Sequence, residues 1–157
     1  MESSLYQWQL ETKFGPLFVI ASSRALVGVY WEQQPAPRAP SLTGPHLRVL
    51  AQAVSEIGEY LGGQRKKFDV AIEFEGTEFQ KKVWGQLQQI PYGTTISYKQ
   101  LAEKLGSAAF RAVGSANGAN RVSIVIPCHR VVATGGGLGG YSGGLDKKRG
   151  LLNLELK

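Results

Sequence analysis

The sequence predicts a mixed α/β fold in two parts, and three observations support this prediction. Apolar and polar residues alternate roughly over residues 5–12 and again over residues 68–74, which is the period of a half-exposed β-strand. Later segments carry apolar residues at the spacing of an amphipathic helix. The chain has 157 residues, 43% of them hydrophobic and 19% charged, which is enough for one domain or two small ones with a real core.

The first part, residues 1–75, is expected to start with three strands that are joined by short turns. The strand candidates are residues 5–12, 17–21 and 25–31, and turn sequences separate them. Three prolines in "EQQPAPRAPSLTG", residues 32–44, then predict a loop.

A helix and a fourth strand are expected to complete this first part. Apolar residues recur at helical spacing from Leu47 to Leu61, and Gly62-Gly63 ends the predicted helix. Residues 68–74 alternate again between apolar and polar side chains, which predicts a strand.

The second part, residues 76–157, is expected to begin with three helices. Thr77 with Gln80, and Ser97 with Gln100, each have the spacing of a capping box, in which the two side chains bond each other's backbone N–H groups. A glycine turn follows the second helix, and a third is expected from Ser107 or Ala108 to about Asn117. Two short helices around such a turn predict a helix-turn-helix.

The third predicted helix, "AAFRAVGSANG", is composed mostly of small residues. A helix that reads bases in the major groove would be expected to carry several long polar side chains. Small residues instead allow a close backbone approach, which favours shape-based contact in a minor groove. Tight packing against a neighbouring helix is the alternative interpretation.

The basic residues are concentrated in the second part of the chain. Residues 1–75 contain 7 Lys or Arg and 8 Asp or Glu, whereas residues 76–157 contain 11 and 4. A basic surface favours a polyanion such as nucleic acid as the partner. An ordinary solvated surface is the alternative.

The single cysteine, Cys128, excludes an internal disulfide and suits a reducing compartment, so a cytoplasmic protein is expected. No apolar run approaches the ~20 residues of a spanning helix. Cys128, His129 and His46 are the whole supply of soft ligands, so neither a metal site nor another cofactor is expected.

The surroundings of Cys128 predict a reactive thiol. The run "SIVI", residues 123–126, is expected to form a buried strand that ends at Pro127, immediately before Cys128. His129 can accept the thiol proton directly or through a water molecule. Seven glycines in residues 133–145 form a loop that can approach a ligand closely. A buried, inert cysteine is the alternative interpretation.

A catalytic histidine generally needs a third group to orient it. Asp146 and Glu155 are the acids that follow Cys128 in the sequence. Glu155 belongs to a predicted C-terminal helix that could fold back toward the cysteine. Spacing alone does not choose between the two acids.

Four segments together resemble the O6-alkylguanine-DNA alkyltransferases. They occur in the order of that family and span nearly all of residues 76–157; they are "IPYGTTISYKQLA", "RAVGSANGAN", "IPCHRVV" and "GYSGGL". The resemblance implies an N-terminal ribonuclease-H-like α/β domain, residues 1–75. It also implies a C-terminal winged-helix domain, residues 76–157, which holds the helix-turn-helix and the active-site cysteine.

The resemblance implies a suicide DNA-repair protein that is modified once. Such a protein binds double-stranded DNA through the minor groove, flips the damaged base out, and transfers an alkyl group from O6-alkylguanine, or from O4-alkylthymine, to its own cysteine. Flipping costs a few kcal/mol of stacking and pairing. A monomer is expected, with cooperative loading on DNA left open.

The resemblance also implies catalytic roles for five residues. Cys128 would accept the alkyl group and His129 would act as its base through a water molecule. Glu155 would orient His129, and Asn120 would tie the helix-turn-helix to the active-site turn. Tyr98 would protonate guanine N3, or hydrogen-bond it, as the base leaves.

Further residues are implied in binding. Val131 and the Cys128 carbonyl would face the guanine amino group, Tyr141 and Ser142 would close over the base, and Lys148 would lie near the pocket. Arg111 would enter the duplex in place of the flipped base. The remaining DNA contacts are assigned to Ala112, Asn117 and Tyr98.

One residue departs from the family pattern, and other functions compete with alkyl transfer. Arg121 stands where many members have proline, which loosens the turn and adds a charge near DNA. A non-catalytic lesion sensor is the leading alternative, although such proteins replace the cysteine that is present here. A Cys-His hydrolase and a purely DNA-binding winged-helix module are the others.

Overall fold

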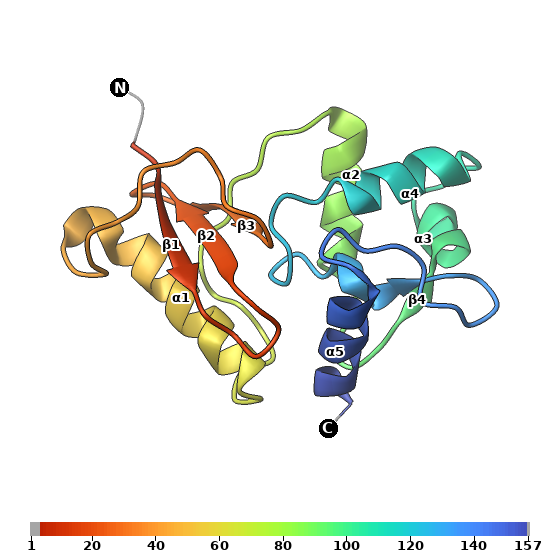
Figure 1. The fold of residues 1–157 in the computed structure, drawn as a ribbon. Helices are drawn as coiled ribbons and strands as arrows, with labels where there is room; N and C mark the ends of the chain where they lie inside the picture. The colour runs from red at the N-terminus through yellow and green to blue at the C-terminus, as the bar shows by residue number, and fades with distance from the viewer. Residues whose placement is uncertain (1–3, 157) are drawn as a thin grey trace. The chain divides into compact units, whose positions relative to one another are not determined.

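The computed structural model describes residues 4–156. The chain divides into two compact units, residues 1–74 and 75–157 (Figure 1). The N-terminal unit combines a sheet with one long helix, whereas the C-terminal unit is mainly helical. The mixed α/β class predicted from the two hydrophobic periods is therefore confirmed.

The N-terminal unit is built on a three-stranded antiparallel sheet of strand order β1-β2-β3. The strands are β1 (Tyr6–Leu10), β2 (Leu17–Ala21) and β3 (Leu26–Tyr30), close to the predicted segments. All five residues of β2 are buried because this strand lies at the centre of the sheet.

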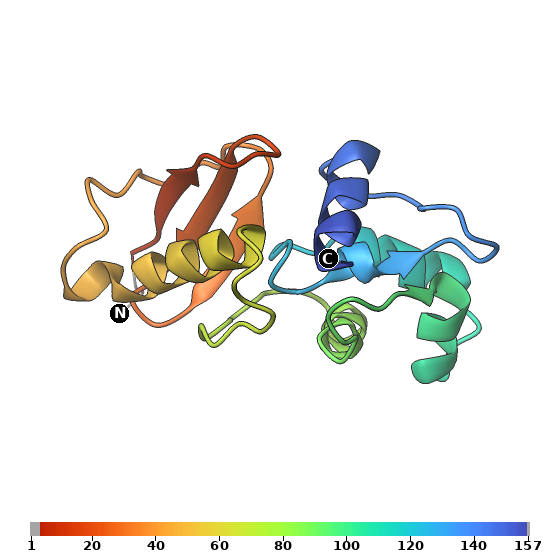
Figure 2. The ribbon, with the colours of Figure 1, turned by 90° about the horizontal axis from the view of Figure 1, so that it is seen from below.

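Helix α1 (Arg48–Leu61) covers one face of this sheet (Figure 2). A short 3-10 helix, η1 (Pro45–Leu47), leads into it. Leu50, Val54 and Ile57 are buried, which confirms the predicted helical stripe. The buried face of α1 and the buried strand β2 together form the core of the unit.

The strand predicted for residues 68–74 is reduced to one bridge. Ile72 pairs with Leu26 of β3 in a parallel bridge. Within residues 4–156, this bridge is not extended into a ladder of several paired residues. The preceding N–H groups, of Asp69 and Val70, donate to the carboxylate of Glu56 in α1. This side-chain contact takes the donors that a ladder would use.

The C-terminal unit contains the three expected helices, α2 (Glu78–Leu87), α3 (Tyr98–Lys104) and α4 (Phe110–Gly118). Thr77 and Ser97 form complete capping boxes with Gln80 and Gln100, as predicted. Helix α4 starts later than expected. The Ala109 N–H donates to the Ser107 hydroxyl, and this local turn delays the first helical residue.

The C-terminal unit also contains elements that the sequence pattern did not predict. Strands β4 (Ile96–Ser97) and β5 (Val131–Val132) pair in parallel. A 3-10 helix, η2 (Cys128–Arg130), precedes β5. Helix α5 (Leu145–Glu155), which is the predicted C-terminal helix, packs against η2. Within residues 4–156, no helix is both long and apolar enough to cross a membrane.

The strand predicted for residues 123–126 is wrong, because this segment forms a tight turn. Ile124 has a left-handed backbone with φ of 74°, and the Ile126 N–H donates back to the Val122 carbonyl. Ile124 and Ile126 are nevertheless fully buried. The apolar run therefore reports burial correctly but not conformation, since core packing can hold β-branched residues in a turn.

Candidate active site

The buried turn before Cys128 is closed by the side chain of Asn120. Its amide donates to the Ile126 carbonyl at 2.7 Å, and its Oδ1 accepts the Val122 N–H at 3.0 Å. Asn120 is itself 7% exposed, so both bonds form in the interior. One side chain thus joins the end of α4 to the segment that positions Cys128.

Cys128 is the first residue of η2 and lies 3% exposed. Burial raises the pKa of its thiol to about 11. A hydrogen bond from Asn120 and the charge of Lys148 act in the opposite direction, because both favour a thiolate. The resting cysteine is therefore a neutral thiol at neutral pH, and it must lose a proton before it can act as a nucleophile.

His129 pairs with Glu155 at the C-terminal end of α5. The ring Nε2 lies 2.7 Å from Glu155 Oε2, and both side chains are almost completely buried. Burial lowers the pKa of His129, although Glu155 partly opposes this effect. A neutral imidazole that is oriented by a carboxylate is the arrangement of a general base.

Arg130 binds the same carboxylate from the other side. Its Nε donates to Glu155 Oε1 at 2.8 Å and one terminal nitrogen donates to Oε2 at 3.0 Å. Such a bidentate ion pair fixes the plane of the carboxylate as well as its charge. Arg130 is buried too, so the pair is shielded from solvent.

The turn after α2 also contacts this cluster. The second terminal nitrogen of Arg130 donates to the Ile90 carbonyl at 2.8 Å, and the Gly93 N–H donates to Glu155 Oε1 at 3.0 Å. Three separate segments therefore meet at Glu155. Arg130 was not among the residues that were given a role from the sequence, although its position directly after the Cys-His pair was an available signal.

Lys148 of α5 is fully buried and links two segments near Cys128. Its Nζ donates to the Val131 carbonyl at 2.7 Å and to the Gly140 carbonyl at 3.0 Å. Burial lowers the pKa of Lys148 to about 8, and the nearby Cys128 partly opposes this effect. At neutral pH Lys148 is therefore charged, and it joins β5 to the glycine-rich loop.

Tyr98 begins α3 and lies against the glycine-rich loop. A Cβ at Gly139 would approach the Tyr98 hydroxyl to 2.8 Å, so a larger residue there would displace the ring. Burial raises the pKa of Tyr98, while hydrogen bonds with the Gly140 backbone and the Asn117 side chain act against this. The Lys148 ammonium also lies 5.8 Å from the centre of the ring.

Asn117 was expected among the DNA contacts, yet its side chain is only 3% exposed. It reaches inward to Tyr98, as the hydrogen bond between the two side chains shows. This burial argues against a direct contact with DNA. The position of Asn117 in the sequence of its helix could not reveal which face that helix buries.

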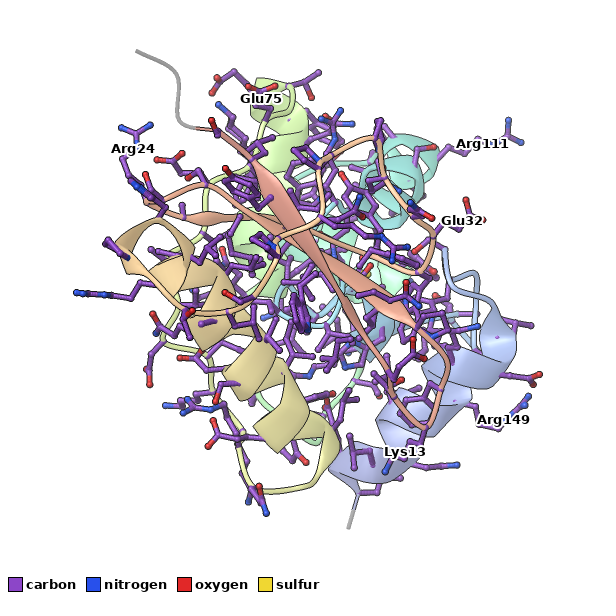
Figure 3. All side chains as sticks on the ribbon, turned by 60° about the vertical axis from the view of Figure 1, so that its left-hand side comes forward. Lys13, Arg24, Glu32, Glu75, Arg111 and Arg149 are labelled. Atoms are coloured by element: carbon purple, nitrogen blue, oxygen red, sulfur yellow. The ribbon has the colours of Figure 1, made fainter. Side chains whose placement is uncertain are left out.

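The remaining predicted residues lie at or near the surface. Arg111 and Ala112 are exposed on α4, and Figure 3 shows the Arg111 side chain extending outward from that helix. Ser142 is exposed and Tyr141 is partly buried in the glycine-rich loop, whereas Val131 is completely buried. Asp146, the other candidate acid, accepts a hydrogen bond from Arg149 at the surface.

Two family models match the chain. One is described as the 6-O-methylguanine DNA methyltransferase ribonuclease-like domain and matches residues 4–74. The other is described as the DNA-binding domain of the same enzyme and matches residues 78–157. Together they account for nearly the whole chain.

Curated relatives carry the name methylated-DNA–protein-cysteine methyltransferase. One from Mycolicibacterium paratuberculosis is 50% identical over 119 residues, covering 74% of this chain and 72% of the relative. Another from Mycobacterium bovis is 38% identical over 147 residues, covering 93% and 89%. Both alignments cover more than two thirds of each relative.

Solved structures show the same architecture. The crystal structure of Mycobacterium tuberculosis OGT in complex with DNA superposes with a TM-score of 0.86 at 36% identity, covering 96% of this chain and 92% of that one. The crystal structure of the Mycobacterium tuberculosis O6-methylguanine methyltransferase superposes with a TM-score of 0.83, also at 36% identity, covering 97% and 93%.

Proposed function

The chain belongs to the 6-O-methylguanine DNA methyltransferase family, and we propose that it repairs double-stranded DNA by moving an alkyl group from guanine O6 to Cys128. The observation that carries this proposal is that Cys128 and His129 are adjacent and both buried, with Glu155 Oε2 lying 2.7 Å from the imidazole Nε2. DNA is its partner, and O6-alkylguanine, together with O4-alkylthymine, is the lesion. A monomer performs the reaction.

The reaction begins with proton removal from the thiol. Its pKa of about 11 leaves little thiolate at neutral pH, so a base must act. His129 is this base and acts through a water molecule, because adjacent residues of a 3-10 helix diverge by about 120°. Glu155 keeps the imidazole oriented and stabilises the imidazolium that forms.

The thiolate then attacks the alkyl carbon. A carbon–sulfur bond forms as the bond between that carbon and O6 breaks, and the bonding pair leaves with guanine. Tyr98 donates a proton to guanine N3, and solvent then carries the proton of the His129 imidazolium back to the tyrosinate, so the net change moves one proton from sulfur to the base. Hydrogen bonds that favour the tyrosinate make Tyr98 a stronger acid than burial alone would.

Each protein molecule reacts once because the product is a thioether. Amino-acid side chains do not cleave a carbon–sulfur bond of this kind, so Cys128 is not regenerated. Displacement at an sp³ carbon by a thiolate needs neither a redox partner nor a metal. The reaction therefore consumes the protein in proportion to the lesions that it repairs.

The binding roles follow from position. The exposed residues Arg111 and Ala112 on α4 face the minor groove, and Arg111 occupies the space of the flipped base. Val131 and the Cys128 carbonyl face the guanine amino group. Tyr141 and Ser142 close over the base, and Lys148 holds their loop against β5 through the Gly140 carbonyl. Asn117 supports Tyr98 from the interior instead of contacting DNA.

The test is incubation with duplex DNA that contains one O6-methylguanine, followed by peptide mass spectrometry. We expect one methyl group on the peptide that contains Cys128 and no further turnover. Arg111→Ala should slow repair of the duplex but not the reaction with free O6-benzylguanine. Binding without transfer would instead support a lesion sensor, and repeated turnover of acyl substrates would support a hydrolase.

A further inference from the structure

An exposed aromatic side chain stands at the start of the helix that carries Arg111. Phe110 is the first residue of α4, and its side chain is 51% exposed. The four residues around it, Ala108, Ala109, Arg111 and Ala112, are exposed as well. The end of α4 therefore protrudes, with one phenyl ring and one guanidinium as its only large side chains.

Phe110 differs in exposure from the other large apolar residue of its helix. The one other residue of α4 with an apolar side chain larger than alanine, Val113, is buried with 0% exposure. A half-exposed phenyl ring forfeits much of the free energy that burial would supply. Among residues 4–156, the other exposed large hydrophobic residues are all leucines, Leu5, Leu145 and Leu156.

The charges around Phe110 identify the kind of surface that would cover it. Lys104, Arg111 and Arg121 are exposed before, beside and after the ring in the sequence. No acidic residue occurs between Glu103 and Asp146. A cationic surrounding repels a basic partner and attracts phosphates, so the ring is placed to meet the grooves of a nucleic acid.

We infer that Phe110 is an apolar wedge that inserts beside Arg111 into the minor groove and unstacks the base step next to the flipped nucleotide. Apolar side chains that enter a minor groove separate neighbouring base pairs in this way. Consecutive side chains of an α-helix leave the axis about 100° apart, so Phe110 reaches a different base step from the position that Arg111 enters. Arg111 fills the vacated position while Phe110 contacts the neighbouring step; this inference rests on the proposed function.

The small residues before and within the first turn of α4 make such insertion possible. Ala108, Ala109 and Ala112 flank the pair and add no bulk that would keep the helix out of a narrow groove. The ring gains contact with a base face, which is independent of base identity because every base presents a π surface. Phe110 would therefore increase affinity for lesions in any sequence context.

The test measures DNA binding and base stacking directly. Cys128→Ser protein is titrated into O6-methylguanine duplexes that carry 2-aminopurine on one or the other side of the lesion, so that transfer does not consume the complex. Phe110→Ala should weaken binding about tenfold. In this variant, the 2-aminopurine fluorescence on one side of the lesion should no longer rise when the protein binds. Phe110→Trp should retain both, and Leu5→Ala, which removes an exposed leucine elsewhere, should behave like the parent.

A second measurement separates a wedge from a structural role. With Cys128 present, all four proteins should react with free O6-benzylguanine at the same rate. Unchanged affinity and fluorescence in Phe110→Ala would overturn the wedge, and so would an equal loss on benzylguanine. Failure of the parent to transfer any alkyl group would contradict the proposed function instead. The binding and fluorescence measurements would still test whether Phe110 acts as a wedge.

Discussion

Within residues 4–156, each unit of the molecule buries one glutamate, and the two carboxylates have different partners. Glu56 in α1 is 4% exposed and accepts hydrogen bonds from the Asp69 and Val70 N–H groups and from Gln52. Glu155 in α5 is 5% exposed and binds His129, Arg130 and the Gly93 N–H. Burial is the same, whereas the donors are neutral in one case and include a guanidinium and an imidazole in the other.

This difference separates a carboxylate with only structural partners from one that contacts the proposed general base. Glu56 joins residues 69–70 to a helix, and neutral donors suffice for that purpose. In the proposed reaction Glu155 keeps a negative charge in the interior beside His129, and the bidentate Arg130 compensates that charge. The nature of the partners, more than burial itself, therefore indicates the function of a buried acid.

The largest expected effect comes from Glu155→Gln. A neutral amide leaves the Arg130 charge buried without its counter-ion. The NH₂ group of the new glutamine is also a donor, so it cannot accept hydrogen bonds from the donors that surround it. We expect alkyl transfer to free O6-benzylguanine to slow by about 10²-fold or more. The C-terminal unit should lose about 3–5 kcal/mol of stability, measured by chemical denaturation with Trp84 as the reporter in a Trp8→Phe, Trp31→Phe background.

Glu56→Gln is the matched control for this change. The amide oxygen can still accept the Asp69 and Val70 N–H groups, so the loss should stay at about 1–2 kcal/mol. The rate of alkyl transfer should equal that of the parent. A slow reaction in Glu56→Gln, or a normal one in Glu155→Gln, would remove the distinction between the two carboxylates.

Alkaline pH should act on the C-terminal unit through Cys128 and Lys148. The folded thiol has a pKa of about 11 against 9.0 in the unfolded chain, so the folded state holds more protons between these values and loses stability as the pH rises. The pKa of Lys148 falls from 10.5 to about 8, which has the opposite effect between pH 8 and 10.5.

Comparison with Cys128→Ser removes the thiol and keeps Lys148. Without Cys128 to oppose the effect of burial, the pKa of Lys148 falls further, which adds to the same trend in the difference between the two proteins. The stability of the parent relative to Cys128→Ser should decline from about pH 9 to about pH 11. Denaturant titrations at intervals across this range provide the measurement. A stability difference that stays constant across this pH range would show that burial does not raise the pKa of the Cys128 thiol.

The smallest effects are expected from the two capping residues of the C-terminal unit. Thr77→Ala and Ser97→Ala each remove a capping box, and each should cost about 1 kcal/mol. Helix α3 begins at Tyr98, whereas α2 contributes no proposed catalytic side chain. Ser97→Ala should therefore also slow repair several-fold. Equal repair rates in the two variants would contradict the proposed role of Tyr98 in the reaction.

Features that depend on neighbouring residues were predictable from the sequence. The strands β1–β3, helix α1 and both capping boxes follow from periodicity or from bonds across three positions. The segment 123–126 and the segment 68–74 were not predictable in this way. Their conformations depend on Asn120 and Glu56, which are side chains outside the segments themselves.

The sequence by itself determined where α2 and α3 begin and that Cys128 and His129 adjoin, because these facts require contacts within one turn of chain. Tertiary structure alone decided that His129 meets Glu155, 26 residues away, while Asp146 stays at the surface. It also decided that Asn117 faces inward and Phe110 outward. The physical reason is that a helical residue's partners depend on which face its helix buries, and only packing sets that face.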